Sequence, residues 1–153
     1  MKINQKIKKV AFIGMGLINS SLARDLKIKK FYLSSSAYSR RLSTINKIKK
    51  LKLVDFASSN IEKTIKEADI IIVGIPVAAY QEVFKKICNN IKPGAIITDV
   101  GSVKKEVINS VKKYIPKNID FVPGHPIAGT ENSGPESGFA GLFKNGWCIL
   151  TPN

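Results

Sequence analysis

The stretch Val10-Ala11-Phe12-Ile13-Gly14-Met15-Gly16-Leu17-Ile18 decides the fold of this 153-residue chain. It leads from an apolar run, over two glycines, into a helical pattern. We predict a strand over Ile7–Ile13, a turn at Gly14-Met15-Gly16 and a helix over Leu17–Lys27. In such a unit the first glycine permits a tight turn, the second lets the backbone approach a pyrophosphate, and the helix N-terminus supplies free N–H groups. The stretch predicts a dinucleotide-binding fold, and its candidate cofactor-binding residues are Gly14, Met15, Gly16, Leu17 and Ile18.

Apolar runs and helical patterns alternate along the rest of the chain. The clearest buried strand lies within Asp69–Ile75, where Ile70-Ile71-Ile72-Val73 runs without alternation. We predict the α/β class: a Rossmann-type, doubly wound, mostly parallel sheet with helices on both faces, in one domain over residues 1–153. The other strands are predicted over Phe31–Tyr38, Val54–Ala57, Ala95–Val100, Ile119–Val122 and Trp147–Leu150, and the other helices over Leu42–Leu51, Ile61–Ala68, Val77–Asn89 and Val103–Tyr114.

The third glycine of the dinucleotide fingerprint is absent, because Asn19 stands at its position. That glycine normally lets the helix pack closely on the sheet. We therefore expect Asn19 either to point outward or to widen the gap between helix and strand. Asn19, Ser20 and Ser21 are also candidates to donate hydrogen bonds to phosphate oxygens.

The region after the second predicted strand bears on the choice of cofactor. NAD-binding folds place Asp or Glu there to hold the ribose 2′-OH, whereas this chain has Tyr38-Ser39-Arg40-Arg41-Leu42-Ser43-Thr44 and no acid. Guanidinium groups and hydroxyls suit a 2′-phosphate. We predict Ser39, Arg40 and Arg41 as cofactor-binding residues and NADP as the preferred cofactor over NAD. The alternative is that the two arginines only begin a solvated helix.

The formal net charge of +14 raises the possibility of a nucleic-acid partner. Lysine supplies most of this charge and occurs throughout the chain, whereas nucleic-acid readers favour clustered arginine and exposed aromatic residues. We predict no nucleic-acid partner, although the surface would favour a small anionic ligand.

Further features bear on compartment. No apolar run reaches the roughly 18 residues of a membrane helix. A secretory signal at the Lys-rich Met1–Lys9 is disfavoured because Gly14 and Gly16 interrupt the apolar run. Cys88 and Cys148 have neither disulfide nor metal spacing, so we predict reduced thiols in or near the core. We expect a cytoplasmic protein with no membrane partner and no metal.

Ligands of open parallel sheets bind beyond the carboxyl ends of the strands, and three predicted strand ends are distinctive. Gly74-Ile75-Pro76 would support a flat ring, and Asp99 with Gly101 follows at the next strand, so all five are candidate cofactor-binding residues. We predict Ser102 as the N-cap of the helix that follows. His125 lies in the glycine-rich segment Gly124–Gly134, which we predict as a loop. Its pKa range suits a general base; the alternative is a histidine that only caps a turn.

Three motifs together resemble the prephenate/arogenate (cyclohexadienyl) dehydrogenase family. They are Gly14-x-Gly16-Leu17-Ile18-x-x-Ser21-Leu22-Ala23, Thr98-Asp99-Val100-Gly101-Ser102-Val103-Lys104 and Gly124-His125-Pro126-x-Ala128-Gly129-Thr130-Glu131-x-Ser133-Gly134. The resemblance implies NAD(P)-dependent oxidative decarboxylation of prephenate or arogenate in tyrosine biosynthesis. It implies that His125 is the catalytic base, that Ser102 contacts the substrate hydroxyl or the nicotinamide side, and that Thr130 and Glu131 gate the substrate. It also suggests that Asp99 fixes its loop.

The resemblance also implies a part that this chain does not show. Family members carry a helical domain after this unit, which makes a homodimer and supplies an arginine for the substrate carboxylate. We therefore expect the chain to be the cofactor-binding part, with little turnover by itself. The alternatives are a β-hydroxyacid-type Rossmann dehydrogenase or reductase, which would carry a catalytic lysine on a later helix, and a non-catalytic nucleotide- or nucleic-acid-binding module.

Overall fold

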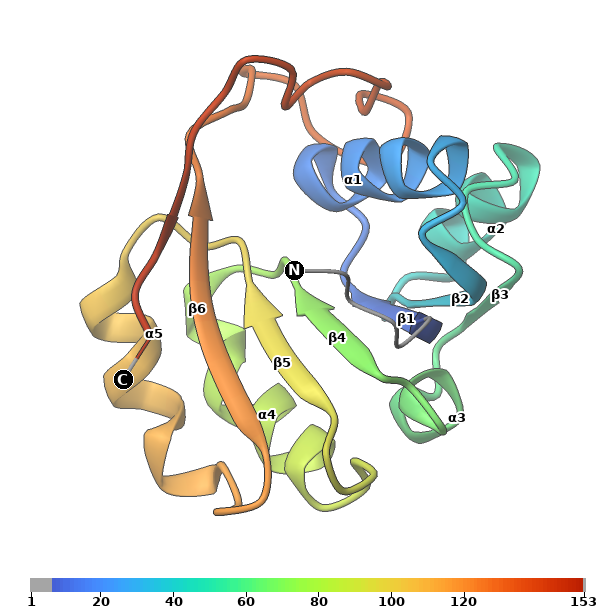
Figure 1. Cartoon of the computed structure of the whole chain (residues 1–153). Helices are drawn as coiled ribbons and strands as arrows, with labels where there is room; N and C mark the ends of the chain where they lie inside the picture. The colour runs from blue at the N-terminus through green and yellow to red at the C-terminus, as the bar shows by residue number, and fades with distance from the viewer. Residues whose placement is uncertain (1–6, 153) are drawn as a thin grey trace.

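The computed structural model describes residues 7–152 and contains a 7-stranded sheet in the order β3-β2-β1-β4-β5-β6-β7 (Figure 1). Strands β1 to β6 pair in parallel, and β7 is antiparallel to β6. This confirms the predicted α/β class with a Rossmann-type strand order. The strands are β1 Ile7–Ile13, β2 Tyr32–Tyr38, β3 Phe56–Ser58, β4 Ile70–Val73, β5 Ile96–Asp99, β6 Asp120–Pro126 and β7 Cys148–Leu150.

Helices lie on both faces of the sheet, and each face has its own apolar core. Helices α1 and α2 pack with one core, whereas α3, α4 and α5 pack with the other. Strand β4 serves both cores: Ile71 and Val73 enter one, and Ile72 enters the other. The helices are α1 Leu17–Ile28, α2 Leu42–Lys50, α3 Ile61–Ile65, α4 Tyr80–Cys88 and α5 Lys104–Val111, with 3-10 turns at Val77–Ala79 and Lys112–Tyr114.

Helix α1 buries a more polar face than its periodicity predicts. Its buried residues are Leu17, Asn19, Ser20, Ser21 and Ala23. The connection over residues 134–146 arches across this helix (Figure 1). The Phe139 N–H donates to Ser21 Oγ at 3.1 Å, and a Cβ built on Gly138 would lie 2.1 Å from Ser20 Oγ. Small polar side chains are therefore buried because a distant segment packs on them.

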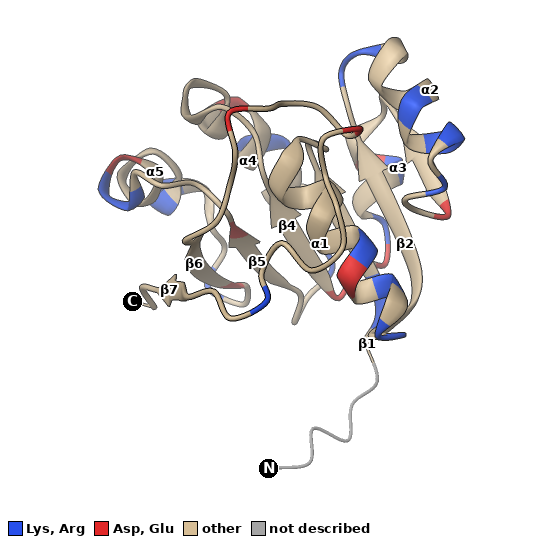
Figure 2. Ribbon diagram, turned by 90° about the horizontal axis from the view of Figure 1, so that it is seen from above, with Lys and Arg blue, Asp and Glu red and all other residues tan. Residues whose placement is uncertain are grey.

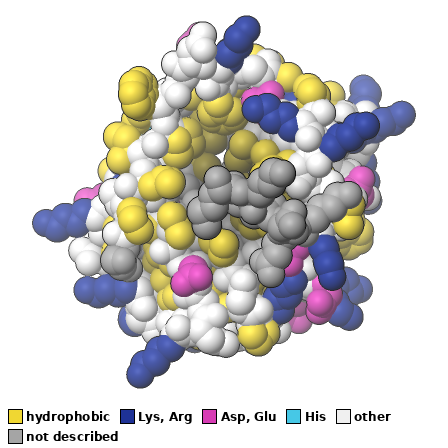
Figure 3. All heavy atoms as spheres, in the orientation of Figure 1, with side chains coloured by type: hydrophobic (Ala, Val, Ile, Leu, Met, Phe, Trp, Pro, Cys, Tyr) yellow, Lys and Arg dark blue, Asp and Glu magenta, His cyan; other side chains and the backbone are white. Residues whose placement is uncertain are grey.

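The face that α1 and α2 share is only partly covered. In Figure 1 β5 and β6 face the viewer, and Figure 3 shows hydrophobic side chains around a hollow on this side. A hollow of about 430 Å³ lies here between α1, the ends of β5 and β6, and Trp147. The expected near-core position is wrong for Cys148, which is exposed because β7 forms the sheet edge. Cys88 is half-buried, and this burial raises the pKa of its thiol to about 11.

The charged side chains are spread over several elements. Figure 2 shows Lys and Arg on α1, α2 and α5, at different sides of the molecule. Within residues 7–152 no helix has the length and apolar character that a membrane span needs. The same residues contain no group of His, Cys, Asp and Glu side chains placed to hold a metal ion. Most of the disfavoured signal segment, residues 1–6, lies outside the described residues.

Candidate active site

The turn after β1 has the shape that a phosphate loop requires. Gly14 has a φ of +84°, and a Cβ there would lie 2.4 Å from the Gly74 carbonyl oxygen. Gly16 is the N-cap of α1, no side chain caps the helix, and its first turn carries no acid. A Cβ on Gly16 would meet nothing within 4 Å. Open space therefore lies at a helix N-terminus that favours an anion, so these residues fit the pyrophosphate of a dinucleotide.

A first hollow of about 400 Å³ extends from this turn to the end of β2. Its lining includes the predicted residues Gly14, Met15, Gly16, Ser39, Arg40, Arg41, Gly74, Ile75 and Pro76. It also includes Thr44, which belongs to the predicted segment after β2, and Glu82, which sequence reasoning missed. Glu82 comes from α4, so only the fold brings it here. Glu82 pairs with Lys86 at 2.7 Å, and this hydrogen bond lowers the pKa of its carboxyl.

We call the turn over Gly14, Met15 and Gly16 the phosphate turn. A second hollow of about 410 Å³ continues from it toward the ends of β4 and β5. It shares Gly16, Gly74, Ile75 and Pro76 with the first hollow, so the two adjoin. Leu17, Ile18 and Gly101 line it, as does Thr130 of the loop that follows β6. Glu131, the other predicted gating residue, is exposed and does not line either hollow.

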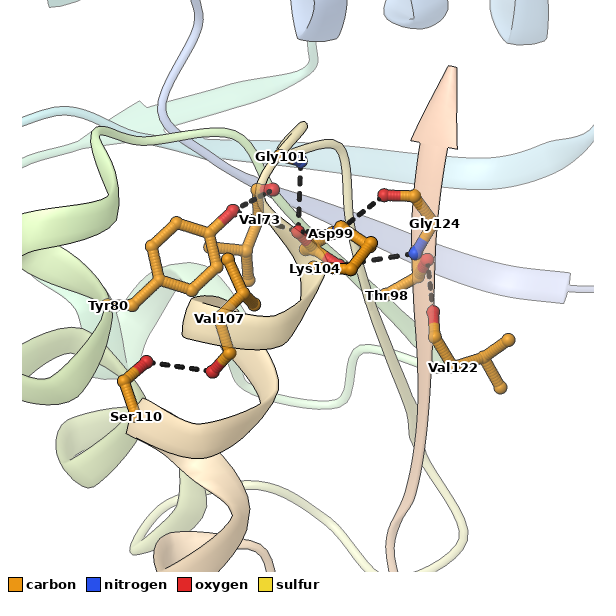
Figure 4. Close-up of polar contacts among 10 residues, drawn as sticks. All are labelled: Val73, Tyr80, Thr98, Asp99, Gly101, Lys104, Val107, Ser110, Val122 and Gly124. Carbon is orange, nitrogen blue, oxygen red and sulfur yellow. Dashed lines mark hydrogen bonds and ion pairs between the residues drawn. The ribbon is translucent and has the colours of Figure 1, made fainter. Parts of the chain in front are cut away.

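Asp99 ends β5, and its carboxylate is enclosed by donors (Figure 4). It is 1% exposed; Oδ2 accepts from Gly101 N at 2.9 Å and from the Tyr80 hydroxyl at 3.2 Å, and Oδ1 accepts from Gly124 N at 3.2 Å. Lys104 pairs with the same carboxylate and also donates to the Gly124 carbonyl at 2.6 Å. The carboxylate holds protein groups and lines neither adjoining hollow, which agrees with the expectation that Asp99 fixes its loop. Cofactor binding by Asp99 stays a prediction.

This cluster links the strand ends that carry the predicted catalytic residues. Gly101 precedes Ser102, and Gly124 precedes His125, so Asp99 and Lys104 fix the backbone beside both. Sequence reasoning missed the positioning role of Lys104 and Tyr80. Burial, and then the charge of Asp99, raises the pKa of the Tyr80 hydroxyl, which therefore stays protonated as a donor.

The structure corrects two local predictions for Ser102 and His125. The residue that caps α5 is Val103, so Ser102 is not the N-cap; it lies exposed in the turn before the helix. His125 does not lie in a loop, because β6 continues to Pro126 and His125 pairs with Ile149 of β7. Pairing with the antiparallel strand β7 supplies hydrogen-bond partners for the backbone around His125, so the strand continues past Gly124.

The half-buried side chain of His125 belongs to the face of the sheet that α5 covers. Side chains alternate along a strand, and Phe121 of β6 enters the core of that face, so His125 falls on the same side. Ser102 leads into α5 on this side. The fold thus brings both residues to the carboxyl ends of neighbouring strands, on one face of the sheet. His125 lines neither adjoining hollow.

The polar residues of α1 also differ from the predictions. Asn19 is 1% exposed, so it does not point outward, and its Nδ2 donates to the Gly14 carbonyl. Ser20 Oγ and Ser21 Oγ donate to the Leu17 carbonyl at 3.1 and 2.8 Å. All three side chains are engaged with backbone, so the prediction that they donate to phosphate is wrong.

Comparison with known proteins decides the family. The family profile described as prephenate dehydrogenase, nucleotide-binding domain, matches residues 22–153. The chain belongs to this family. The match includes Ser102, His125, Thr130 and Glu131, and membership favours the predicted resemblance over a β-hydroxyacid-type enzyme.

Individual relatives agree with this membership. Cyclohexadienyl dehydrogenase of Zymomonas mobilis is 39% identical over 146 residues, covering 95% of the chain and 50% of the relative. The crystal structure of prephenate dehydrogenase from Aquifex aeolicus with hydroxyphenyl propionate and NAD+ matches with a TM-score of 0.89 and 29% identity, over 98% of the chain and 52% of that protein. Synechocystis arogenate dehydrogenase matches with a TM-score of 0.85 and 32% identity, over 95% and 50%. The chain therefore spans about half the length of these relatives.

Proposed function

We propose that the chain is the cofactor-binding part of an NAD(P)-dependent dehydrogenase that oxidatively decarboxylates prephenate or arogenate. The observation that carries this proposal is the pair of adjoining hollows, which share Gly16 and Gly74 and meet over the phosphate turn. One hollow suits the adenosine half of a dinucleotide and the other its nicotinamide half. The family of the chain and the NAD+ bound to the Aquifex aeolicus relative support the same assignment.

We propose NADP as the preferred cofactor. Ser39, Arg40 and Arg41 line the far end of the first hollow, and the segment between β2 and α2 has no acid that would repel a 2′-phosphate. Glu82 also lines this hollow, but its pairing with Lys86 offsets its charge. The balance of charge therefore favours a phosphate at this end.

In the proposed reaction, a bound nicotinamide supplies the acceptor for the hydride that leaves the ring carbon bearing the hydroxyl. His125 takes the hydroxyl proton as that hydride departs, and Ser102 holds the hydroxyl oxygen. When the bond to the carboxylate breaks, CO₂ leaves, its electron pair enters the ring, and His125 returns the proton to the oxygen of the aromatic product. Histidine suits both transfers because its ordinary pKa lies near neutrality.

We propose that Thr130 and Glu131 act at the mouth of the substrate site, since Thr130 lines the second hollow. None of the three arginines lies in that hollow: Arg40 and Arg41 line the first, and Arg24 donates to the Pro135 carbonyl at 3.4 Å. We propose that residues outside this chain hold the substrate carboxylate. We expect the complete enzyme to be a cytoplasmic homodimer of tyrosine biosynthesis.

The cofactor assignment is tested by titrating the chain with NADP+ and NAD+, before and after Arg40→Asp. We expect the native chain to prefer NADP+, and the variant to lose about tenfold in NADP+ affinity, because a guanidinium–phosphate hydrogen bond becomes a repulsion. Lys105→Asp, an equal charge change at an exposed site on α5, is the control and should leave both affinities unchanged. Unchanged NADP+ affinity in Arg40→Asp would show that these residues only begin a solvated helix.

The division of labour is tested by adding prephenate to the NADP+-loaded chain and following the absorbance of reduced nicotinamide. We expect binding of cofactor with little turnover. Rapid turnover by the 153-residue chain would overturn the proposal that it is only the cofactor-binding part.

A further inference from the structure

We propose that Asn19 is a positioning residue for the cofactor diphosphate: its side-chain amide ties the phosphate turn to β4, in place of the close helix–sheet contact that a third glycine permits. This inference rests on dinucleotide binding by the two adjoining hollows. It assigns to Asn19 a function that neither the family fingerprint nor a direct phosphate contact supplies.

The amide links three elements from a buried position. Asn19 lies in the first turns of α1 and is 1% exposed. Its Nδ2 lies 2.8 Å from the carbonyl oxygen of Gly14 and 3.4 Å from that of Ile72. Because both partners are acceptors, the end of the amide that faces them has to be its NH₂ group. One side chain thereby connects the phosphate turn, the helix that follows it and strand β4.

Gly74 provides the space that this side chain needs. A Cβ built on Gly74 would lie 2.6 Å from Nδ2 and 2.8 Å from Cγ of Asn19. A Cβ built on Gly14 would in turn lie 2.4 Å from the Gly74 carbonyl oxygen. The chain therefore has its space-making glycine on the facing strand end instead of on the helix, and Gly14, Asn19 and Gly74 form one interlocked contact.

The Asn19 amide acts on one half of the proposed cofactor site. Asn19 and Gly74 both line the second hollow, beside the residues that begin α1. The arginines at the adenosine end line the first hollow, which Asn19 does not line. The Oδ1 atom of Asn19 has no hydrogen-bond partner within residues 7–152, so the amide is held only through its nitrogen. Removing the amide should release the turn under the diphosphate while leaving the adenosine contacts in place.

The experiment compares Asn19→Ala and Asn19→Gly with the native chain. Calorimetric titration measures the affinity for NADP+ and for adenosine 2′-monophosphate, which keeps the adenosine and the 2′-phosphate but lacks the nicotinamide half and both phosphates of the bridge. We expect both variants to bind NADP+ about tenfold more weakly, as loss of a buried hydrogen bond implies. Affinity for adenosine 2′-monophosphate should stay within about twofold, because this ligand does not reach the turn over Gly14–Gly16 and its adenosine contacts are unchanged.

Two controls separate positioning from simple stability. Asn90→Ala removes an exposed asparagine whose Nδ2 also donates to a carbonyl, that of Lys86, and should change neither affinity. Asn19→Gly introduces the glycine of the dinucleotide fingerprint. It is expected to fold, so the test can be made with it even if Asn19→Ala is unstable.

The outcomes are distinct. Equal loss of both affinities, or NADP+ binding by Asn19→Gly as tight as that of the native chain, would overturn the positioning role. Failure of the native chain to bind any dinucleotide would instead overturn the proposed function itself.

Discussion

Two aspartate–lysine pairs lie at opposite ends of the parallel strands. At the amino ends, just before β4, Asp69 accepts from the backbone N–H groups of Lys8 and Lys9 and pairs with Lys92. At the carboxyl ends, Asp99 accepts from the N–H groups of Gly101 and Gly124 and pairs with Lys104. Each carboxylate therefore joins neighbouring strands through two backbone donors and one ammonium group.

The two pairs differ in burial and in what they hold. The side chains of Lys92 and Asp69 are 29% and 25% exposed, whereas those of Lys104 and Asp99 are 13% and 0% exposed. Only the second pair adjoins the predicted catalytic residues. The same kind of pair thus joins two strands at their amino ends and supports a candidate site at the carboxyl ends. Because an unpaired charge costs more when buried, breaking the two pairs should lower the free energy of unfolding unequally.

The largest effect is expected for Lys104→Met, which leaves Asp99 buried without its ammonium partner. We expect a loss of about 3–5 kcal/mol in the free energy of unfolding, measured by urea denaturation at neutral pH. Lys105→Met, a neighbouring exposed lysine, is the control and should change little. If both variants lose equally little free energy of unfolding, burial does not distinguish the two aspartate–lysine pairs.

A smaller, pH-dependent effect is expected for Asp69→Asn. Burial raises the pKa of Asp69, but hydrogen bonds from Lys92 and from the backbone of Lys9 and Lys8 together outweigh it, so the pKa lies below its ordinary value. The ionised carboxylate therefore stabilises the fold above the unfolded pKa of about 3.9, and this contribution disappears as pH falls through the lower, folded value. We expect the variant to lose about 1–2 kcal/mol at neutral pH.

The measurement is urea denaturation of both proteins at neutral pH and in acid. The difference between native protein and Asp69→Asn should narrow on acidification, since the native carboxylate then becomes neutral as well. Asp120→Asn, at the exposed start of β6, controls for loss of a surface carboxylate. A difference that stays constant or widens in acid would contradict the assigned role of Asp69.

The smallest effect is expected at the exposed pair between α2 and the connection over α1. Lys47 and Glu136 are 2.7 Å apart, but their side chains are 48% and 53% exposed. We expect Lys47→Ala to cost under about 1 kcal/mol, and less in high salt. The same denaturation series, with Lys49→Ala as control, extends the comparison to a solvated pair; a loss as large as that of Lys104→Met would remove burial as the explanation.

Local pattern predicted the elements well where neighbouring residues decide the structure. The apolar run in β4 and the glycines after β1 are read from consecutive residues, and both predictions are confirmed. The predicted end of β6 was wrong because Gly124 suggested a loop, whereas pairing with β7 extends the strand. The predicted apolar face of α1 was incomplete because Ser20 and Ser21 are buried by the segment around Gly138.

The order of strands and helices, the phosphate turn and the family motifs required only the sequence, because periodicity and turn chemistry are properties of adjacent residues. Only the tertiary structure could show that Tyr80 and Lys104 enclose the Asp99 carboxylate, that Glu82 lies beside the arginines and that Asn19 packs against Gly74. Each of these depends on atoms that are distant in the chain or on the direction of one side chain. No local pattern encodes such distances, so they emerge only when the strands pack into one sheet.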